Sequence, residues 1–264
     1  MFGKLMKYEL KSLSKGLLPL YGAILIVAAI NAVMMGTSAE INVDGWAQVT
    51  AIMLYTALCV SVAVMTLIII VQRFYKGLLG QEGYLMFTLP VPTWQLTCSK
   101  LLGASLMCIL SGIVGITSVL ILGAGTFVGP DFFAELREIL TYIDGDSILF
   151  LFEILIGMLV DISASICQIY LAIALGHLSN QHRVAMSIVW YIAINTVLTF
   201  IGAVLTNVTM NAPGVTDFIF GAIFNSGISN VHEFMWIGIA ISAVQGAIFY
   251  FITNYVLKNK LNLE

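Results

Sequence analysis

The chain has 264 residues, of which 60% are hydrophobic and only 9% are charged. Soluble domains carry about 25% charged residues, so this composition excludes an ordinary water-soluble fold. The formal net charge of -3 is small, and the positions of the charges are more informative than their sum. The length suits one helical bundle, and neither a linker nor an internal repeat divides the chain.

Residues 1–16 predict an amphipathic helix that lies in the membrane interface. Four lysines recur there at helical spacing: Lys4, Lys7, Lys11 and Lys15. Hydrophobic residues occupy another side of the same helix: Phe2, Leu5, Met6, Leu10 and Leu13. The start of a signal peptide is the alternative, but the apolar run from Leu17 to Gly36 is too long for one.

Six apolar runs are each near or above the roughly 20 residues that cross a bilayer core. They cover residues 17–36, 48–71, 101–128, 148–175, 185–206 and 234–257. We therefore predict an all-α integral membrane protein with one transmembrane domain over 17–257 and a tail over 258–264. The connection over 207–233 is either a surface loop or a broken segment that re-enters the membrane, because Pro213 and Gly214 interrupt it.

The cations set the predicted orientation, because Lys and Arg beside short loops are retained in the cytoplasm. Of the 11 lysines and arginines, only Arg137 falls on the opposite side of a six-span topology. Most acidic residues fall on the side of Arg137, including Glu40, Asp44 and Asp131. We therefore predict that both termini are cytoplasmic.

The cytoplasmic connection from Gln72 to Lys100 is too long for a tight turn. Pro90 and Pro92 stop a helix, and Thr93 can cap the next one. The apolar residues 84–87 would be costly to leave in water, so we expect lipid headgroups or a partner protein to cover them.

Three stretches of this region carry a resemblance to a known family. They are Glu82-Gly83-Tyr84-Leu85, Thr88-Leu89-Pro90-Val91 and Ser99-Lys100-Leu101-Leu102. Here the chain resembles the permease subunits of ATP-binding-cassette (ABC) exporters of the type-two class, specifically small bacterial permeases. The resemblance implies a protein of the bacterial cell membrane that exports a hydrophobic or amphipathic compound, such as an antimicrobial peptide or a drug.

In that family the first cytoplasmic loop docks on a separate nucleotide-binding subunit, whose ATP hydrolysis drives transport. The resemblance implies five contact residues for this ATPase: Glu82, Gly83, Tyr84, Leu85 and Phe87. The second cytoplasmic loop, with His177, His182 and Arg183, would lie close to the same partner. His177 and His182 have a spacing that suits a metal, but Asn180 and Gln181 interrupt it, so we expect interfacial or solvated histidines.

The chain has no G-x-x-x-x-G-K-[ST] loop, so we predict that it is not an enzyme and binds no cofactor. ATP and Mg²⁺ would be bound by the partner ATPase. One six-helix half also needs a second half, either a copy of itself in a homodimer or a related permease. Membrane lipids are the other expected partners; we expect no nucleic acid and no metal site, and the four cysteines lack zinc-ligand spacing.

Polar residues in the fourth run mark the candidate substrate path. Glu153, Gly157, Asp161, Ser165 and Gln168 recur at spacings of four, four, four and three, which places them on one helix face. An ionised carboxylate that faces lipid costs about 2.5–3.5 kcal/mol, so Asp161 should face protein or water. We predict a substrate path that includes Asp161, Ser165, Gln168, Asn31 and Asn195. The alternative is that Asp161 is a protonated or hydrogen-bonded packing residue, paired with Asn31 or Asn195.

Two other function classes remain as alternatives. A non-transporting membrane anchor or assembly protein would show no substrate-stimulated ATPase activity. An intramembrane enzyme would use Asp161 as its acid, but no second carboxylate lies at membrane depth in this topology. His232-Glu233 resembles the start of a zinc-protease H-E-x-x-H motif, but Trp236 occupies the second ligand position.

Overall fold

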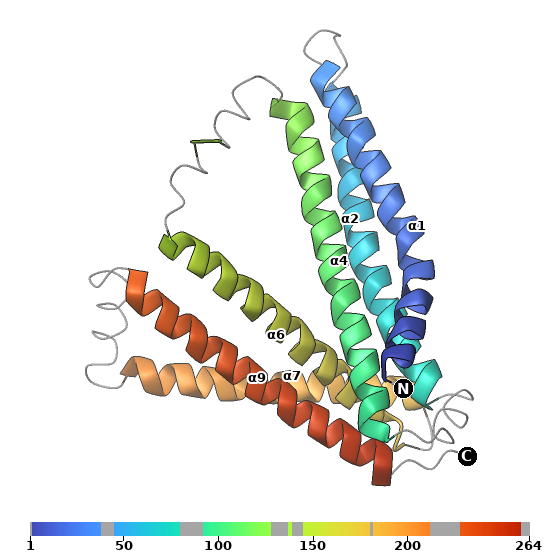
Figure 1. Cartoon of the computed structure of the whole chain (residues 1–264), viewed down its shortest axis with the longest axis vertical. Helices are drawn as coiled ribbons and strands as arrows, with labels where there is room; N and C mark the ends of the chain where they lie inside the picture. The colour runs from blue at the N-terminus through green and yellow to red at the C-terminus, as the bar shows by residue number, and fades with distance from the viewer. Residues whose placement is uncertain are drawn as a thin grey trace. The chain divides into compact units, whose positions relative to one another are not determined.

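In the computed structural model the described residues are 2–37, 45–79, 92–127, 137–138, 145–179, 182–211 and 228–259. Within these ranges the chain is helical and contains no strand (Figure 1). The long helices are α1 (Phe2–Thr37), α2 (Gly45–Phe74), α4 (Thr93–Phe127), α6 (Gly145–Gly176), α7 (Arg183–Asn211) and α9 (Ile228–Asn259). A short π-helix, η1 (Tyr75–Leu79), follows α2 directly.

These six long helices contain the segments that can cross a membrane. The segments are Phe2–Met34, Val49–Leu79, Thr93–Leu122, Ser147–Gly176, Arg183–Val208 and His232–Asn259. The shortest has 26 residues, and at about 1.5 Å per residue it exceeds a bilayer core of about 30 Å. The expectation of an all-helical chain with six helices long and apolar enough to span a bilayer is therefore confirmed over the described residues.

Three helices begin well before the predicted spans. Helix α1 is continuous from Phe2 to Thr37 and passes through Pro19, so residues 1–16 and the first span belong to one helix. Helix α4 begins at Thr93, the residue predicted to cap it, and so extends ahead of the span predicted from 101. Helix α9 begins at Ile228, inside the connection predicted over 207–233. The interfacial position of residues 1–16 and the cytoplasmic location of both termini stay predictions.

Large apolar side chains cover the outside of these helices. On α7, for example, Ile192, Phe200 and Val208 are 58%, 70% and 63% exposed. Contiguous apolar surface on this scale is costly in water. Lipid or another protein must therefore cover it, as expected for a multi-pass membrane protein.

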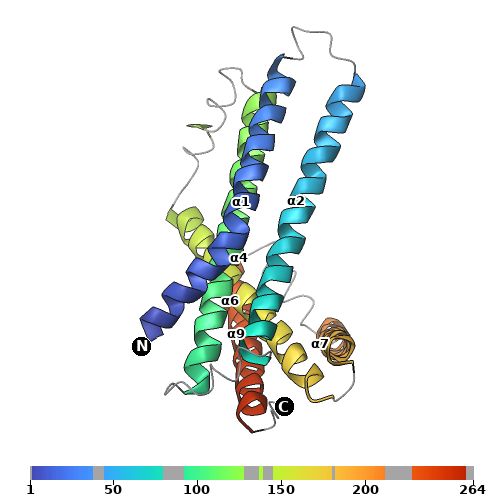
Figure 2. The ribbon, with the colours of Figure 1, turned by 90° about the vertical axis from the view of Figure 1, so that its right-hand side faces the viewer.

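The chain divides into two compact units, and the first comprises Met1–Arg73 and Leu102–Ile143. Figure 2 shows α1 and α2 of this unit running in opposite directions. Buried residues recur along α1 with a helical period, from Leu13 to Ala28, and pack against residues of α2 and α4. The Tyr21 hydroxyl donates to the Met107 carbonyl at 3.2 Å, so polar contacts also join α1 to α4.

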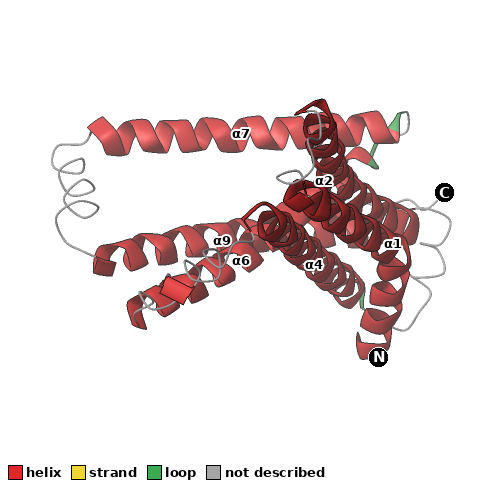
Figure 3. Cartoon of the chain, turned by 90° about the horizontal axis from the view of Figure 1, so that it is seen from above, coloured by secondary structure: helices red, strands yellow, loops and turns green. Residues whose placement is uncertain are grey.

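The second unit comprises Phe74–Leu101 and Asp144–Glu264. Helix α6 packs against both α7 and α9, and α9 lies beside it in Figure 3. Small residues allow this close packing, because a Cβ added at Gly246 would lie 3.1 Å from the Cα of Ala164. Gly176 is packed against Ser187 of α7 in the same way.

Candidate functional site

The second unit holds an aromatic and basic cluster at the C-terminal end of α6. The Phe74 ring stacks on Tyr170 with ring centroids 3.8 Å apart and an interplanar angle of 12°. Both side chains are buried. One residue further along, Tyr75 meets His177 edge to face with centroids 5.7 Å apart. The end of α2 and the start of η1 are thereby fixed to the end of α6.

Lys100 of α4 reaches the same place on α6. Its carbonyl accepts a hydrogen bond from the Tyr170 hydroxyl at 3.4 Å, and its side chain is only 4% exposed. The Lys100 ammonium group lies against Gly77, where an added Cβ would be 2.5 Å from Nζ. Any residue larger than glycine at position 77 would therefore displace a buried charge.

Together these residues form what we call the α6 clamp: Phe74, Tyr75, Gly77, Lys100, Tyr170 and His177. Phe74, Tyr75 and Gly77 precede residues 80–91 in the chain, and Lys100 follows them. Both flanks of that segment are therefore held by the same end of α6. An aromatic pair of this kind contributes about 0.5–1.5 kcal/mol of stability in addition to the hydrophobic effect of the area that it buries.

The turn after α6 places a neutral histidine beside an arginine. Arg183 Nη1 donates to His177 Nε2 at 3.2 Å, and since a guanidinium has only donors, Nε2 must accept. His177 therefore carries its proton on Nδ1, which has no hydrogen-bond partner within the described residues. Burial lowers the pKa of His177 below its ordinary value of 6.5, and the positive charge of Arg183 lowers it further. His177 is buried, so it is not a solvated histidine; its position at the membrane interface stays a prediction.

His182 has a strained backbone at the start of α7. Its φ is 55°, in the left-handed region that residues other than glycine rarely adopt. The His182 carbonyl nevertheless accepts the bond from the Met186 amide at 3.0 Å and so begins the helix. His182 therefore fixes the first turn of α7.

A second polar site joins α6 to α9, and we call it the Glu153 contact. The Glu153 carboxylate accepts one hydrogen bond from Trp236 Nε1 at 2.8 Å and lies 2.6 Å from His232 Nδ1. The side chain of Phe150 packs edge to face against His232, with centroids 6.2 Å apart. Glu153 is 1% exposed, so α9 satisfies a carboxylate that is buried inside a spanning helix.

Sequence reasoning missed the Glu153 contact. It treated Glu153 as one of five residues on a helix face, and His232 and Trp236 only as a failed zinc motif. The sequence did contain one indication of this contact. His232 and Trp236 lie four residues apart, which puts two N–H donors on one face of a helix, where they can bind a carboxylate.

The other residues of the candidate substrate path do not gather around Asp161. Asp161 and Ser165 are exposed, whereas Gln168 is buried, with an Nε2 atom that has no hydrogen-bond partner within the described residues. A spacing of four drifts by about 40° per step and a spacing of three reverses by about 60°, so the five positions stay within an arc of about 120° on α6. The helices that pack at each level of α6 therefore decide which of these residues is buried.

The two asparagines make local contacts instead. Asn195 donates to the Tyr191 carbonyl of its own helix at 3.0 Å. Asn31 belongs to the first unit, where it donates to the Ala51 carbonyl of α2 at 3.2 Å. No hydrogen bond between Asp161 and Asn195 is found in the described ranges. The role of these residues in a substrate path stays a prediction.

The implied ATPase contacts lie outside the described residues: Glu82, Gly83, Tyr84, Leu85 and Phe87. Most of the 207–233 connection lies outside them too. Where the chain is described, no group of three or more His, Cys, Asp or Glu side chains is placed to hold a metal ion.

No protein-family model, no curated protein and no solved structure matches the chain. Its function must therefore be argued from its own residues. The described helices make buried polar contacts with one another, and the α6 clamp holds both flanks of residues 80–91. Such contacts allow a movement of one helix to be passed to its neighbours.

Proposed function

We propose that the chain is the permease subunit of an ABC exporter of the type-two class, driven by a separate ATPase. The observation that supports this best is the α6 clamp. It holds both flanks of residues 80–91, the segment whose sequence resembles the ATPase-docking loop of that family.

The clamp offers a physical route for coupling. A force on residues 80–91 is passed to the end of α6, because Phe74 and Lys100 are both attached to Tyr170. Since α6 packs against α7 and α9, a shift of α6 must be accompanied by repacking of its neighbours. Packed helices respond to such forces by discrete shear or rotation, which suits alternation between inward and outward access.

The exposed position of Asp161 indicates that protein or water, and not lipid, covers this part of α6. Asp161 is exposed near the middle of the Ser147–Gly176 span. Contact of its ionised form with lipid would cost about 2.5–3.5 kcal/mol. A substrate path at the junction with a second copy, or with a related permease, would remove that cost.

The rest of the proposal follows from the permease assignment. The chain lies in a bacterial cell membrane with both termini in the cytoplasm, binds no nucleotide itself, and leaves ATP and Mg²⁺ to its partner. Its cargo is a hydrophobic or amphipathic compound, because few ionisable residues lie in the spans.

Co-purification tests this function directly. The tagged chain, expressed together with the genes that neighbour its own, should retain an ATPase through purification in a mild detergent. Glu82→Ala and Tyr84→Ala should weaken the retention, whereas Glu138→Ala, at an exposed position on the opposite side of the topology, should not.

Two results would contradict the proposal. If no ATPase co-purifies with the unmodified chain, the transporter assignment fails and a membrane anchor or assembly protein becomes the better hypothesis. If an ATPase is retained equally by the Tyr84→Ala and Glu138→Ala variants, the docking role of residues 80–91 is wrong.

A further inference from the structure

Two adjoining cavities form a groove at one end of the second unit. The first, of about 640 Å³, lies between α4, α6 and α9, and we call it the slot. Its walls are apolar, and small residues such as Cys98, Ala164 and Gly246 leave the space open. This volume falls within the range of about 300–1,000 Å³ that is typical of small-molecule sites.

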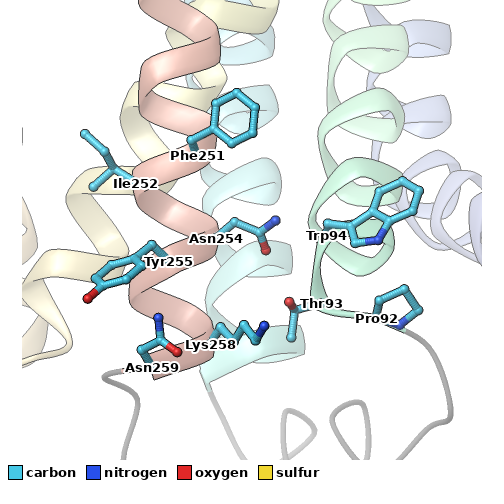
Figure 4. Close-up of a pocket in the computed structure, with 9 residues that line it drawn as sticks. All are labelled: Pro92, Thr93, Trp94, Phe251, Ile252, Asn254, Tyr255, Lys258 and Asn259. Atoms are coloured by element: carbon cyan, nitrogen blue, oxygen red, sulfur yellow. The ribbon is translucent and has the colours of Figure 1, made fainter.

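The second cavity, of about 840 Å³, lies between the start of α4 and the end of α9, and we call it the mouth. The slot and the mouth share Trp94 and Phe251, so they are continuous. Figure 4 shows the polar residues of the mouth, with Lys258 of α9 directed toward Thr93 of α4. The groove is therefore apolar at one end and polar at the other.

The polar end has unused binding capacity. Lys258 is exposed, and among the described residues no carboxylate lies within salt-bridge distance of it. Asn254 Oδ1 is buried without a hydrogen-bond partner in the same part of the structure. Within the described part of the chain, the mouth thus combines a cationic group without a counter-ion and an amide oxygen without a hydrogen-bond donor.

The groove lies at the ends of two segments that are long and apolar enough to cross a membrane. The Thr93–Leu122 segment begins and the His232–Asn259 segment ends at the mouth. When these segments cross a bilayer, the mouth is at its surface and the slot is within the hydrocarbon. The Tyr250 hydroxyl donates to the Trp94 carbonyl at 2.7 Å and ties α9 to α4 there. Tyr and Trp side chains are favoured at this depth.

We propose that the groove binds an anionic phospholipid, with one acyl chain in the slot and the headgroup at Lys258. The apolar slot matches the acyl chain, Lys258 of the mouth matches the negative phosphate, and the depth matches that of a lipid already in the bilayer. This site depends only on membrane insertion, so it stands or falls separately from the exporter assignment.

Photo-crosslinking of the full chain in lipid nanodiscs tests the site. The probe is phosphatidylglycerol with a diazirine in one acyl chain, and adducts are mapped by peptide mass spectrometry. We expect adducts on the slot walls near Cys98, Cys167 and Tyr250. Unlabelled phosphatidylglycerol should compete about fivefold better than phosphatidylcholine, the preference that one basic residue near the headgroups provides.

Two variants separate the two ends of the groove. Lys258→Gln should abolish the preference for the anionic competitor without moving the adducts, and Lys11→Gln, at an exposed lysine of α1, should leave it intact. Ala243→Phe places a ring in the slot from an exposed position of α9 and should reduce the adducts there by more than fivefold.

Three results would overturn the proposal. Adducts spread evenly over all lipid-facing helices would mean that no defined site exists. Equal competition by the two lipids, or an unchanged preference in Lys258→Gln, would remove the role of the cation. Lipid adducts that are found elsewhere on the chain but are absent from the slot walls would show that lipid does not occupy the groove.

Discussion

Replacement of Glu153 by alanine should destabilise the bundle by a predictable amount. The substitution removes the acceptor for Trp236 Nε1 at 2.8 Å and the partner of His232 Nδ1 at 2.6 Å. Hydrogen bonds between membrane helices are worth about 0.6 kcal/mol on average and about 1.7 kcal/mol at most. The two contacts together therefore contribute roughly 1–3 kcal/mol to the free energy of unfolding.

The assay is reversible unfolding of the purified protein in mixed micelles, with the fraction of SDS as the variable. Asp161→Ala is the matched control, because Asp161 is a carboxylate on the same helix but is exposed. We expect Glu153→Ala to lower the free energy of unfolding by at least 1 kcal/mol more than Asp161→Ala, as estimated above. Glu153→Gln should fall between wild type and alanine, because its amide keeps one acceptor oxygen.

A double-mutant cycle isolates the contact itself. Trp236→Phe removes one donor, so its effect should be smaller in the Glu153→Ala background than in the wild type. If the two effects add, or if Glu153→Ala and Asp161→Ala are equivalent, the reasoning about a buried α6–α9 contact is refuted.

Three further substitutions test the packing and the charges. Gly246→Leu should separate α6 from α9 and lower the free energy of unfolding by about 1–3 kcal/mol in the same assay. Gly238→Leu, with nothing within 4 Å of its added Cβ, should lower it little. Equal losses in the two variants would contradict the close approach of α6 and α9. Burial and a neighbouring arginine lower the pKa of His177 below 6.5. The contribution of this histidine to the free energy of unfolding is therefore complete above pH 6.5 and decreases as the pH falls below that value. His177→Gln should flatten this decline in the unfolding free energy, and an unchanged pH profile would exclude the histidine. Glu9 and Arg73 form an ion pair of 3.0 Å that is partly exposed, so neutralising either residue should lower the free energy of unfolding by about 0.5–1 kcal/mol. The charge-swapped variant Glu9→Arg/Arg73→Glu should recover part of that loss. Failure to recover any stability would argue against a direct pair.

The six long helices could be predicted from sequence because lipid imposes a simple requirement. Every backbone N–H and C=O in the bilayer core must be paired within the chain, and a helix of about 20 apolar residues satisfies this locally. The helix starts were harder. Thr93 was predicted to cap the third long helix, and α4 does begin there, but the predicted apolar span began only at residue 101. The first turns of α4 include Lys100, whose burial against Gly77 the sequence did not indicate.

The contacts between helices could not be predicted from one-dimensional patterns. Glu153 and Trp236 are 83 residues apart, and their pairing depends on which faces of α6 and α9 meet. A four-residue spacing suggested one polar face on α6, yet Asp161 is exposed while Glu153 and Gln168 are buried. Periodicity fixes which residues share a helix surface only over about two turns, and packing partners decide the rest.

The same limit applies to the α6 clamp. The sequence drew attention to residues 80–91 through a family resemblance and an apolar loop centre. It gave no sign that Phe74 would stack on Tyr170, or that Lys100 would meet the same tyrosine, because 70 residues separate Lys100 from Tyr170.

Crosslinking from position 84 in intact cells tests the central claim most directly. A photo-reactive amino acid replaces Tyr84 in a strain that also expresses the ATPase that co-purifies with the chain. The account predicts a light-dependent adduct between the chain and the ATPase that is absent when the same amino acid replaces Glu138. Absence of that adduct from position 84, with the ATPase present at normal levels, would contradict the proposed docking segment.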